Sequence, residues 1–207
     1  MHLDSLLLLL PSPCPRNMHE TSRLLDAASA LSRLLRAAEV PHAFYGSVYT
    51  AMLANAPHAD EIFCIVEGGA SHPFRRVRHA CAGSEDFTTV ISPWSSRLHA
   101  TYHGYIPSID IEILPAGEQG PRRLDSSTVQ IIRRIPFLTM SEFIRAKLKA
   151  WALRGAENDA RDIIFTISRY WNRVDINRIP EQEMNDFVCQ HREAAAGWME
   201  LKRKYRE

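Results

Sequence analysis

The sequence lacks the features that mark several large classes of protein. Its 207 residues include four cysteines, none at CxxC spacing, which excludes a zinc ribbon and a thioredoxin-like redox motif. No apolar run approaches the roughly 20 residues of a membrane span. The formal net charge of +1 gives no broad basic field for nucleic acid or an anionic membrane. We therefore expect a soluble, cytoplasmic protein, and we expect neither nucleic acid nor a membrane as its partner.

Signatures of common enzyme classes are also missing. The sequence contains no GxSxG nucleophile elbow, no P-loop and no GxGxxG dinucleotide fingerprint. His99 and His103 stand four residues apart on an expected strand. At the rise of a strand they lie about 13 Å apart, too far to share one metal ion. The histidines therefore indicate no metal site.

The first 17 residues differ from the rest of the chain. Leu6 to Leu10 form a short apolar run, which a proline-rich stretch follows. A secretory signal would need a basic start and about 7 to 15 apolar residues, and this segment has neither. We expect residues 1–17 to be a disordered leader, with Met18 as an alternative start.

What the sequence does contain is the composition and patterning of a globular α+β chain. Apolar residues make up 45% and charged residues 24%, as in ordinary globular domains. Three- and four-residue apolar spacing predicts helices, and strict alternation predicts strands, most clearly over 109–114. The expected helices are 17–40, 48–55 and 72–82, and the expected strands are 42–45, 61–67, 87–92, 98–103, 109–114 and 128–135.

The last third is expected to be helical throughout. Thr139 and Glu142 have the spacing of a capping box and predict the start of a helix that Gly155 ends. Further helices are expected over 158–172, from Pro180 onward, and over 193–206. The fold class is therefore α+β: a small mixed sheet with flanking helices over 18–138, then a C-terminal helical bundle over 139–207.

One ordered set of residues points to phosphate chemistry. Gly46 and Ser47 lie between a strand and a helix, and Glu61 begins the next strand. Amides of a glycine turn at a helix N-terminus can hold a triphosphate. Carboxylates on one face of a sheet can hold magnesium ions that stabilise the attacking and leaving oxygens. Asp110 and Glu112 alternate with isoleucines on a later strand.

This order resembles the polymerase-beta-like nucleotidyltransferase superfamily, including its bacterial toxin-type and fungal members. In that family a Gly-Gly or Gly-Ser turn precedes a helix, the next strand carries Asp-x-Asp, and a third carboxylate follows on a later strand. By this resemblance Gly46 and Ser47 match the turn, Glu61 matches the first aspartate, and Asp110 or Glu112 matches the third carboxylate.

The chain departs from the family pattern at the second aspartate. Phe63 stands there and cannot bind a metal, and Pro57 and Ala59 replace the arginine and threonine that usually precede the motif. The C-terminal region keeps the pattern better. Its order of Lys147, Arg154, Asp159 and Asp162 is similar to the family's series of Lys, Arg, Lys-Asp and Asp-Ile. In the family the lysine of this series faces the triphosphate. The alternatives are an exposed helix lysine for Lys147 and structural pairing of the tail helices for Arg154, Asp159 and Asp162.

The resemblance implies a protein that binds a nucleoside triphosphate and Mg²⁺ and transfers a nucleotidyl group to a small molecule or a protein. Glu61 and Asp110 would hold the metal, with Glu112 as a third catalytic carboxylate, while Gly46, Ser47 and Lys147 would bind the triphosphate. One alternative is an inactive module of the same fold that binds a small molecule or a protein partner. Another is a scaffold turned to different chemistry. The oligomeric state is left open.

Overall fold

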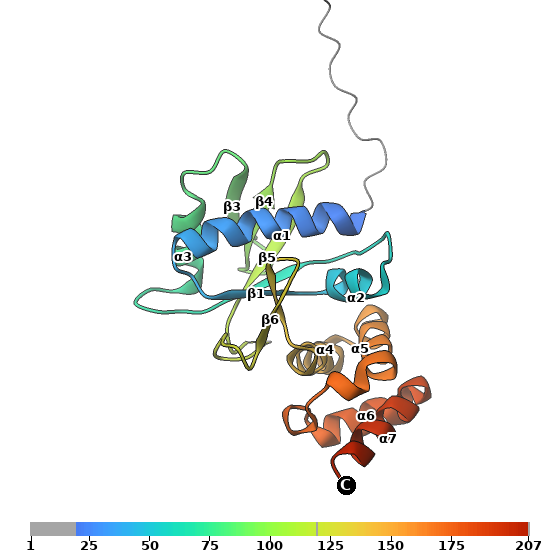
Figure 1. Ribbon diagram of the computed structural model, residues 1–207. Helices are drawn as coiled ribbons and strands as arrows, with labels where there is room; N and C mark the ends of the chain where they lie inside the picture. Colours follow the sequence, from blue (N-terminus) through green and yellow to red (C-terminus); the bar gives the residue numbers. More distant parts are fainter. Residues whose placement is uncertain (1–19, 119, 207) are drawn as a thin grey trace, which may run out of the picture.

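The sheet of seven strands forms the centre of the molecule. A computed structural model describes residues 20–118 and 120–206. The strand order is β3-β4-β5-β2-β1-β7-β6. In Figure 1, α1 and α3 cover one face of this sheet, and α4 to α7 gather beside α2 at one side of it. The bounds of the strands are β1 His42–Tyr45, β2 Phe63–Val66, β3 Phe87–Ile91, β4 Leu98–Tyr102, β5 Ile109–Pro115, β6 Val129–Ile132 and β7 Ile135–Leu138.

Seven α-helices accompany the sheet in the described part of the chain. The first three alternate with strands, and the other four follow one another after β7, as the change of patterning in the sequence predicts. The α+β class with a mixed sheet and a C-terminal helical region is therefore confirmed. The helices are α1 Glu20–Ala37, α2 Ser47–Ala54, α3 Pro73–Cys81, α4 Met140–Arg154, α5 Glu157–Tyr170, α6 Glu181–Gln190 and α7 Ala195–Lys204.

The mixed directions of the central strands place the chemistry-bearing residues side by side. Strand β2 runs antiparallel to β1 and parallel to β5, with Phe63 opposite Tyr45 on one side and Glu112 on the other. Strand β1 also pairs with β7 in parallel. Cross-strand partners share a face of the sheet, so Tyr45, Phe63 and Glu112 form one row across it.

The prediction of a single strand over 128–135 is wrong, because the chain forms a hairpin there. Strands β6 and β7 pair antiparallel with Ile132 opposite Ile135. The two residues between them, Arg133 and Arg134, both have positive φ, at 50° and 66°. Positive φ at both positions is what a two-residue type I′ turn requires. Because such turns usually carry Asn or Gly, two arginines gave no turn signal, and β7 was missed.

The expected capping box is also wrong. Thr139 lies at the N-cap of α4 but makes no side-chain capping bond, and its buried hydroxyl has no hydrogen-bond partner among residues 20–118 and 120–206. Glu142 is 1% exposed, and its carboxylate accepts from Arg178 Nη1 at 2.8 Å. A buried carboxylate gains more from a cation than from a backbone amide, so Glu142 is not available to the helix start. Gly155 ends α4 in the left-handed conformation, as expected.

Two other helix ends differ from the sequence expectation. Helix α1 was expected to end at Val40 but ends three residues earlier, at Ala37. Glu39, which follows the helix, has a positive φ of 52°. Pro180 precedes α6 as its N-cap residue and so lies outside its first turn. The leader expected over 1–17 lies outside the described residues. Within the described part of the chain, no helix is long and apolar enough to cross a membrane.

Candidate functional site

The glycine turn brings the backbone of Gly46 against that of Glu61. Gly46 has φ 119°, and a Cβ placed on it would lie 2.7 Å from the carbonyl oxygen of Glu61. That carbonyl accepts from the N–H of Val48 at 3.3 Å, in the first turn of α2. Glycine is therefore required here by both backbone conformation and space. The start of α2 is held by the chain that leads into β2.

The Ser47 side chain stabilises the same contact between the start of α2 and the segment before β2. Its hydroxyl oxygen accepts from the backbone N–H groups of Asp60 and Glu61, at 2.9 and 3.0 Å. The sequence predicts Gly46 and Ser47 as phosphate ligands. In this structure the Ser47 hydroxyl already fixes the approach to β2, and the Glu61 side chain contacts Lys147 on α4.

Lys147 lies inside the molecule, at the centre of a carboxylate cluster. Its side chain is 1% exposed, so the expectation of an exposed helix lysine is wrong. The ammonium Nζ lies 2.5 Å from Glu61 Oε1, 3.0 Å from Asp159 Oδ1 and 2.9 Å from Asp162 Oδ2. A buried ammonium needs such partners, because burying an unpaired charge costs several kcal/mol. We call Lys147, Glu61, Asp159 and Asp162 the ion cluster.

Arg154 and Thr50 form further hydrogen bonds with the two aspartates of the ion cluster. Arg154 donates to both oxygens of Asp159, through Nε at 2.7 Å and Nη2 at 3.0 Å. This ion pair joins α4 to α5, which is the structural role that the sequence offers as an alternative for Arg154 and Asp159. The hydroxyl of Thr50 on α2 donates to Asp162 Oδ1 at 2.5 Å. The ion cluster therefore joins α2, α4, α5 and the segment before β2.

The electrostatics of the ion cluster favour the charged lysine. Burial by itself lowers the pKa of Lys147, but the carboxylates of Asp162, Glu61 and Asp159 outweigh it and raise that pKa. Burial by itself would raise the pKa of Asp159, yet hydrogen bonds and charge from Arg154 and Lys147 bring it below its usual value. Each partner thus stabilises the ionised form of the other.

Phe63 begins β2, two residues after Glu61 in the chain. Its ring lies 5.1 Å from that of Tyr45, centroid to centroid. Tyr45 is 2% exposed, and burial, followed by the charges of Glu61 and Glu112, raises the pKa of its hydroxyl. Two aromatic rings therefore lie side by side in the row that continues to Glu112, at the position where the family pattern has its second aspartate.

The two carboxylates of β5 are engaged elsewhere. Asp110 is exposed and accepts from the Thr101 hydroxyl at 2.6 Å on the neighbouring strand. Glu112 lies 3.8 Å from the guanidinium of Arg97. The two lie two residues apart on one strand face, about 7 Å along it. The fold does bring Glu112 beside Phe63, but each β5 carboxylate already has a protein partner.

The residues present do not fit a magnesium centre. Within residues 20–118 and 120–206, no group of three or more His, Cys, Asp or Glu side chains is placed to hold a metal ion. Mg²⁺ demands near-octahedral oxygen geometry at roughly 2.0–2.1 Å, and a two-metal site needs several convergent carboxylates. In the ion cluster the position beside Glu61, Asp159 and Asp162 is filled by the Lys147 ammonium.

Sequence reasoning found part of this site and missed the rest. The family pattern pointed to Glu61, Lys147 and the tail aspartates, which the fold assembles. The roles of Tyr45 and Thr50 were missed, because each acts through a contact made across the fold. The one available signal was Tyr45 itself, a residue with a polar hydroxyl that follows the apolar Ala43 and Phe44 at the end of β1.

Comparison with known proteins bears on the fold. The sequence matches no protein-family model and no curated protein. The structure is similar to that of an antigenic nucleotidyltransferase-like protein from Paracoccidioides brasiliensis, with a TM-score of 0.60, 15% identity, and coverage of 86% of this chain and 93% of that one. It is also similar to a proposed nucleotidyltransferase from H. pylori, with a TM-score of 0.50, 14% identity, and coverage of 85% and 83%. The chain therefore has the nucleotidyltransferase-like fold that its sequence resembles.

Proposed function

We propose that this chain is a nucleotidyltransferase-fold protein that binds a small molecule and does not transfer a nucleotide. The observation that carries the proposal is the position of Lys147 Nζ, within 3.0 Å of carboxylates from Glu61, Asp159 and Asp162. An ammonium at this place supplies the positive charge that the carboxylates need. It is fixed to the chain and, unlike a bound metal ion, it offers no coordination position to a substrate oxygen.

The triphosphate-binding groups expected from the resemblance are engaged as well. The Ser47 hydroxyl accepts two backbone amides, and the ammonium of Lys147 is buried among carboxylates. A triphosphate brought to this place would approach Glu61 and Asp162 directly, and like charges repel. Nucleoside triphosphate with Mg²⁺, the ligand that the resemblance implies, is therefore the weaker candidate.

Calorimetry with the four common nucleoside triphosphates, each with and without Mg²⁺, tests the proposal. We expect no heat of specific binding and no incorporation of label from nucleotides labelled at the α-phosphate. A second arm uses Phe63→Asp, which restores a carboxylate at the position where the family has its second aspartate. Magnesium-dependent binding to the natural chain, abolished by Glu61→Gln, would show that the ion cluster opens for nucleotide and that the proposal is wrong.

A further inference from the structure

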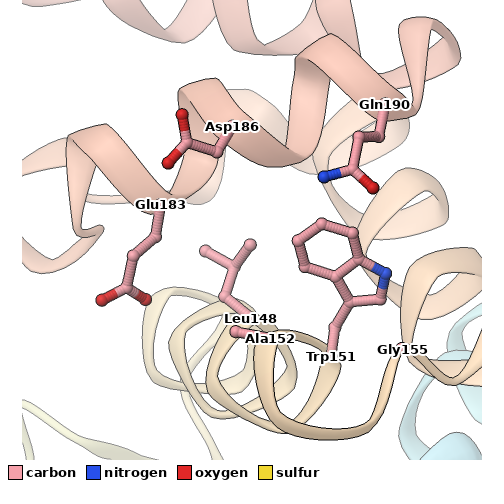
Figure 2. A pocket seen from close by; sticks show the side chains of 7 residues that line it. All are labelled: Leu148, Trp151, Ala152, Gly155, Glu183, Asp186 and Gln190. Carbon is pink, nitrogen blue, oxygen red and sulfur yellow. The ribbon is translucent and has the colours of Figure 1, made fainter.

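The helical region contains a cavity that the ion cluster does not use. It lies between α4 and α6, with a volume of about 370 Å³ (Figure 2). Pockets that hold small molecules in proteins usually measure roughly 300–1,000 Å³. The cavity is therefore large enough for a small organic ligand.

The two walls of the cavity differ in character. Helix α4 contributes Leu148 and Trp151, one helical turn apart, and in Figure 2 both face α6. Helix α6 contributes Glu183, Asp186 and Gln190, whose spacing of three and four residues puts them on one helical face. One wall is thus hydrocarbon and aromatic, and the other carries carboxylates and an amide.

The ring of Trp151 packs against residues at the C-terminal end of α6. It makes edge-on contacts with Phe187 at 4.9 Å and His191 at 5.6 Å between ring centroids. The indole is half-buried, so part of it remains accessible from the cavity. A fixed aromatic ring offers an apolar surface and a negative π-face that attracts cations.

The charge of the lining is negative and is not neutralised within it. Neither Glu183 nor Asp186 forms an ion pair with another residue in the described part of the chain. Asp186 accepts one hydrogen bond, from Gln182 at 2.9 Å. Glu183 also borders a second hollow, which is lined by Arg145 and Lys149. The charge of Asp186 is therefore the less offset of the two.

We propose that this cavity binds a small organic cation, an ammonium joined to an apolar body. The apolar body would lie on Leu148 and Trp151, and the ammonium would point to Asp186 and Glu183. This inference rests on the proposed function in one respect: it names the class of ligand and the binding site for the small-molecule binding proposed above.

Three probes of one shape and different charge test the inference. Phenethylammonium is the cation, 2-phenylethanol the neutral probe, and 3-phenylpropionate the anion. Each is titrated into the full chain while the indole N–H signal of Trp151 is followed by NMR. We expect the cation to shift this signal with a Kd of about 1 mM or tighter, as a ligand of this size allows. The neutral probe should bind more weakly, and the anion should not bind.

Two variants with the same change of charge separate the carboxylate's role from a general electrostatic effect. Asp186→Asn should weaken binding of the cation by about threefold to fivefold, the upper part of the range for a solvent-accessible ion pair. Binding of 2-phenylethanol should not change. Glu193→Gln removes the same charge outside the cavity and should leave both affinities as they were.

The inference is overturned if the neutral probe binds as well as the cation, or if Asp186→Asn and Glu193→Gln weaken binding equally. It is also overturned if no probe shifts the Trp151 signal at millimolar concentration. These results are independent of the nucleotide measurements. A chain that transfers nucleotides and binds the cation would refute the proposed function alone, and one that does neither would refute this inference alone.

Discussion

The backbone of Gly46 touches that of Glu61 so closely that only glycine fits, since a Cβ on Gly46 would lie 2.7 Å from the Glu61 carbonyl oxygen. The contact fixes the first turn of α2 against the segment that carries Glu61 into the ion cluster. The glycine turn of this fold thus has a structural use that is independent of any phosphate.

Gly46→Ala should therefore destabilise the protein strongly. The substitution combines a positive φ with a clash against backbone that cannot move aside, and we expect a loss of at least about 2 kcal/mol in the free energy of unfolding. Urea unfolding followed by circular dichroism measures it. Gly155→Ala keeps the positive φ but meets open space, and should cost about 1 kcal/mol. Gly83→Ala has neither problem and should cost little. Equal losses in all three variants would contradict the close contact.

Lys147→Met should be among the most damaging single substitutions in the chain. It leaves Asp159, which is 0% exposed, and Asp162, which is 6% exposed, without their shared cation. Breaking a buried ion pair from one side usually costs about 3–5 kcal/mol. Thermal and urea unfolding test this, with Lys149→Met, an exposed lysine on the same helix, as the matched control. A loss below about 1 kcal/mol would mean that the ion cluster does not stabilise the fold.

His42 should make stability fall as the solution becomes acidic. The ring is 6% exposed, bonds to Ser32 Oγ at 2.8 Å and to the Val40 carbonyl at 2.7 Å, and burial lowers its pKa from 6.5 to about 4. The unfolded chain binds the proton more readily, so the contribution is complete above pH 6.5 and is lost as the pH falls to about 4. The loss amounts to roughly 3 kcal/mol.

Unfolding free energies measured between pH 7 and pH 4 check this dependence. His42→Gln should flatten the curve over this range, whereas His58→Gln, at an exposed loop position, should leave it unchanged. An identical slope in the natural chain and in His42→Gln would assign the dependence to other groups.

Arg134→Gly should stabilise the hairpin that joins β6 and β7. Arg134 has φ 66°, which costs a side-chain-bearing residue roughly 1–2 kcal/mol and costs glycine nothing. The greater freedom of glycine in the unfolded chain offsets part of this gain, and about 0.5–1 kcal/mol should remain. Arg134→Ala keeps the strain and is the control. A gain for alanine as large as that for glycine would show that removal of the arginine charge is responsible.

The sequence predicts the parts of this fold that local patterning controls. The alternation over 109–114 and the glycine at the end of α4 predict β5 (Ile109–Pro115) and the end of α4 correctly. The β6–β7 hairpin was missed, because positive φ at two arginines is imposed by the sheet on both sides and opposes local preference. Lys147 has charged neighbours two residues away on each side, which gives it the local pattern of a surface lysine. Its partner Glu61 is 86 residues away in the chain, and only the fold brings the two together.

The central claim is that Glu61, Asp159 and Asp162 are neutralised by the Lys147 ammonium and not by a metal ion. A titration of the ¹⁵N-labelled natural chain with Mn²⁺, which broadens NMR signals near its binding site, tests this most directly. We predict that the amides of Glu61, Phe63 and Glu112 keep their line widths at millimolar Mn²⁺. Selective broadening of these three signals at micromolar Mn²⁺, removed by Glu61→Gln, would contradict the account.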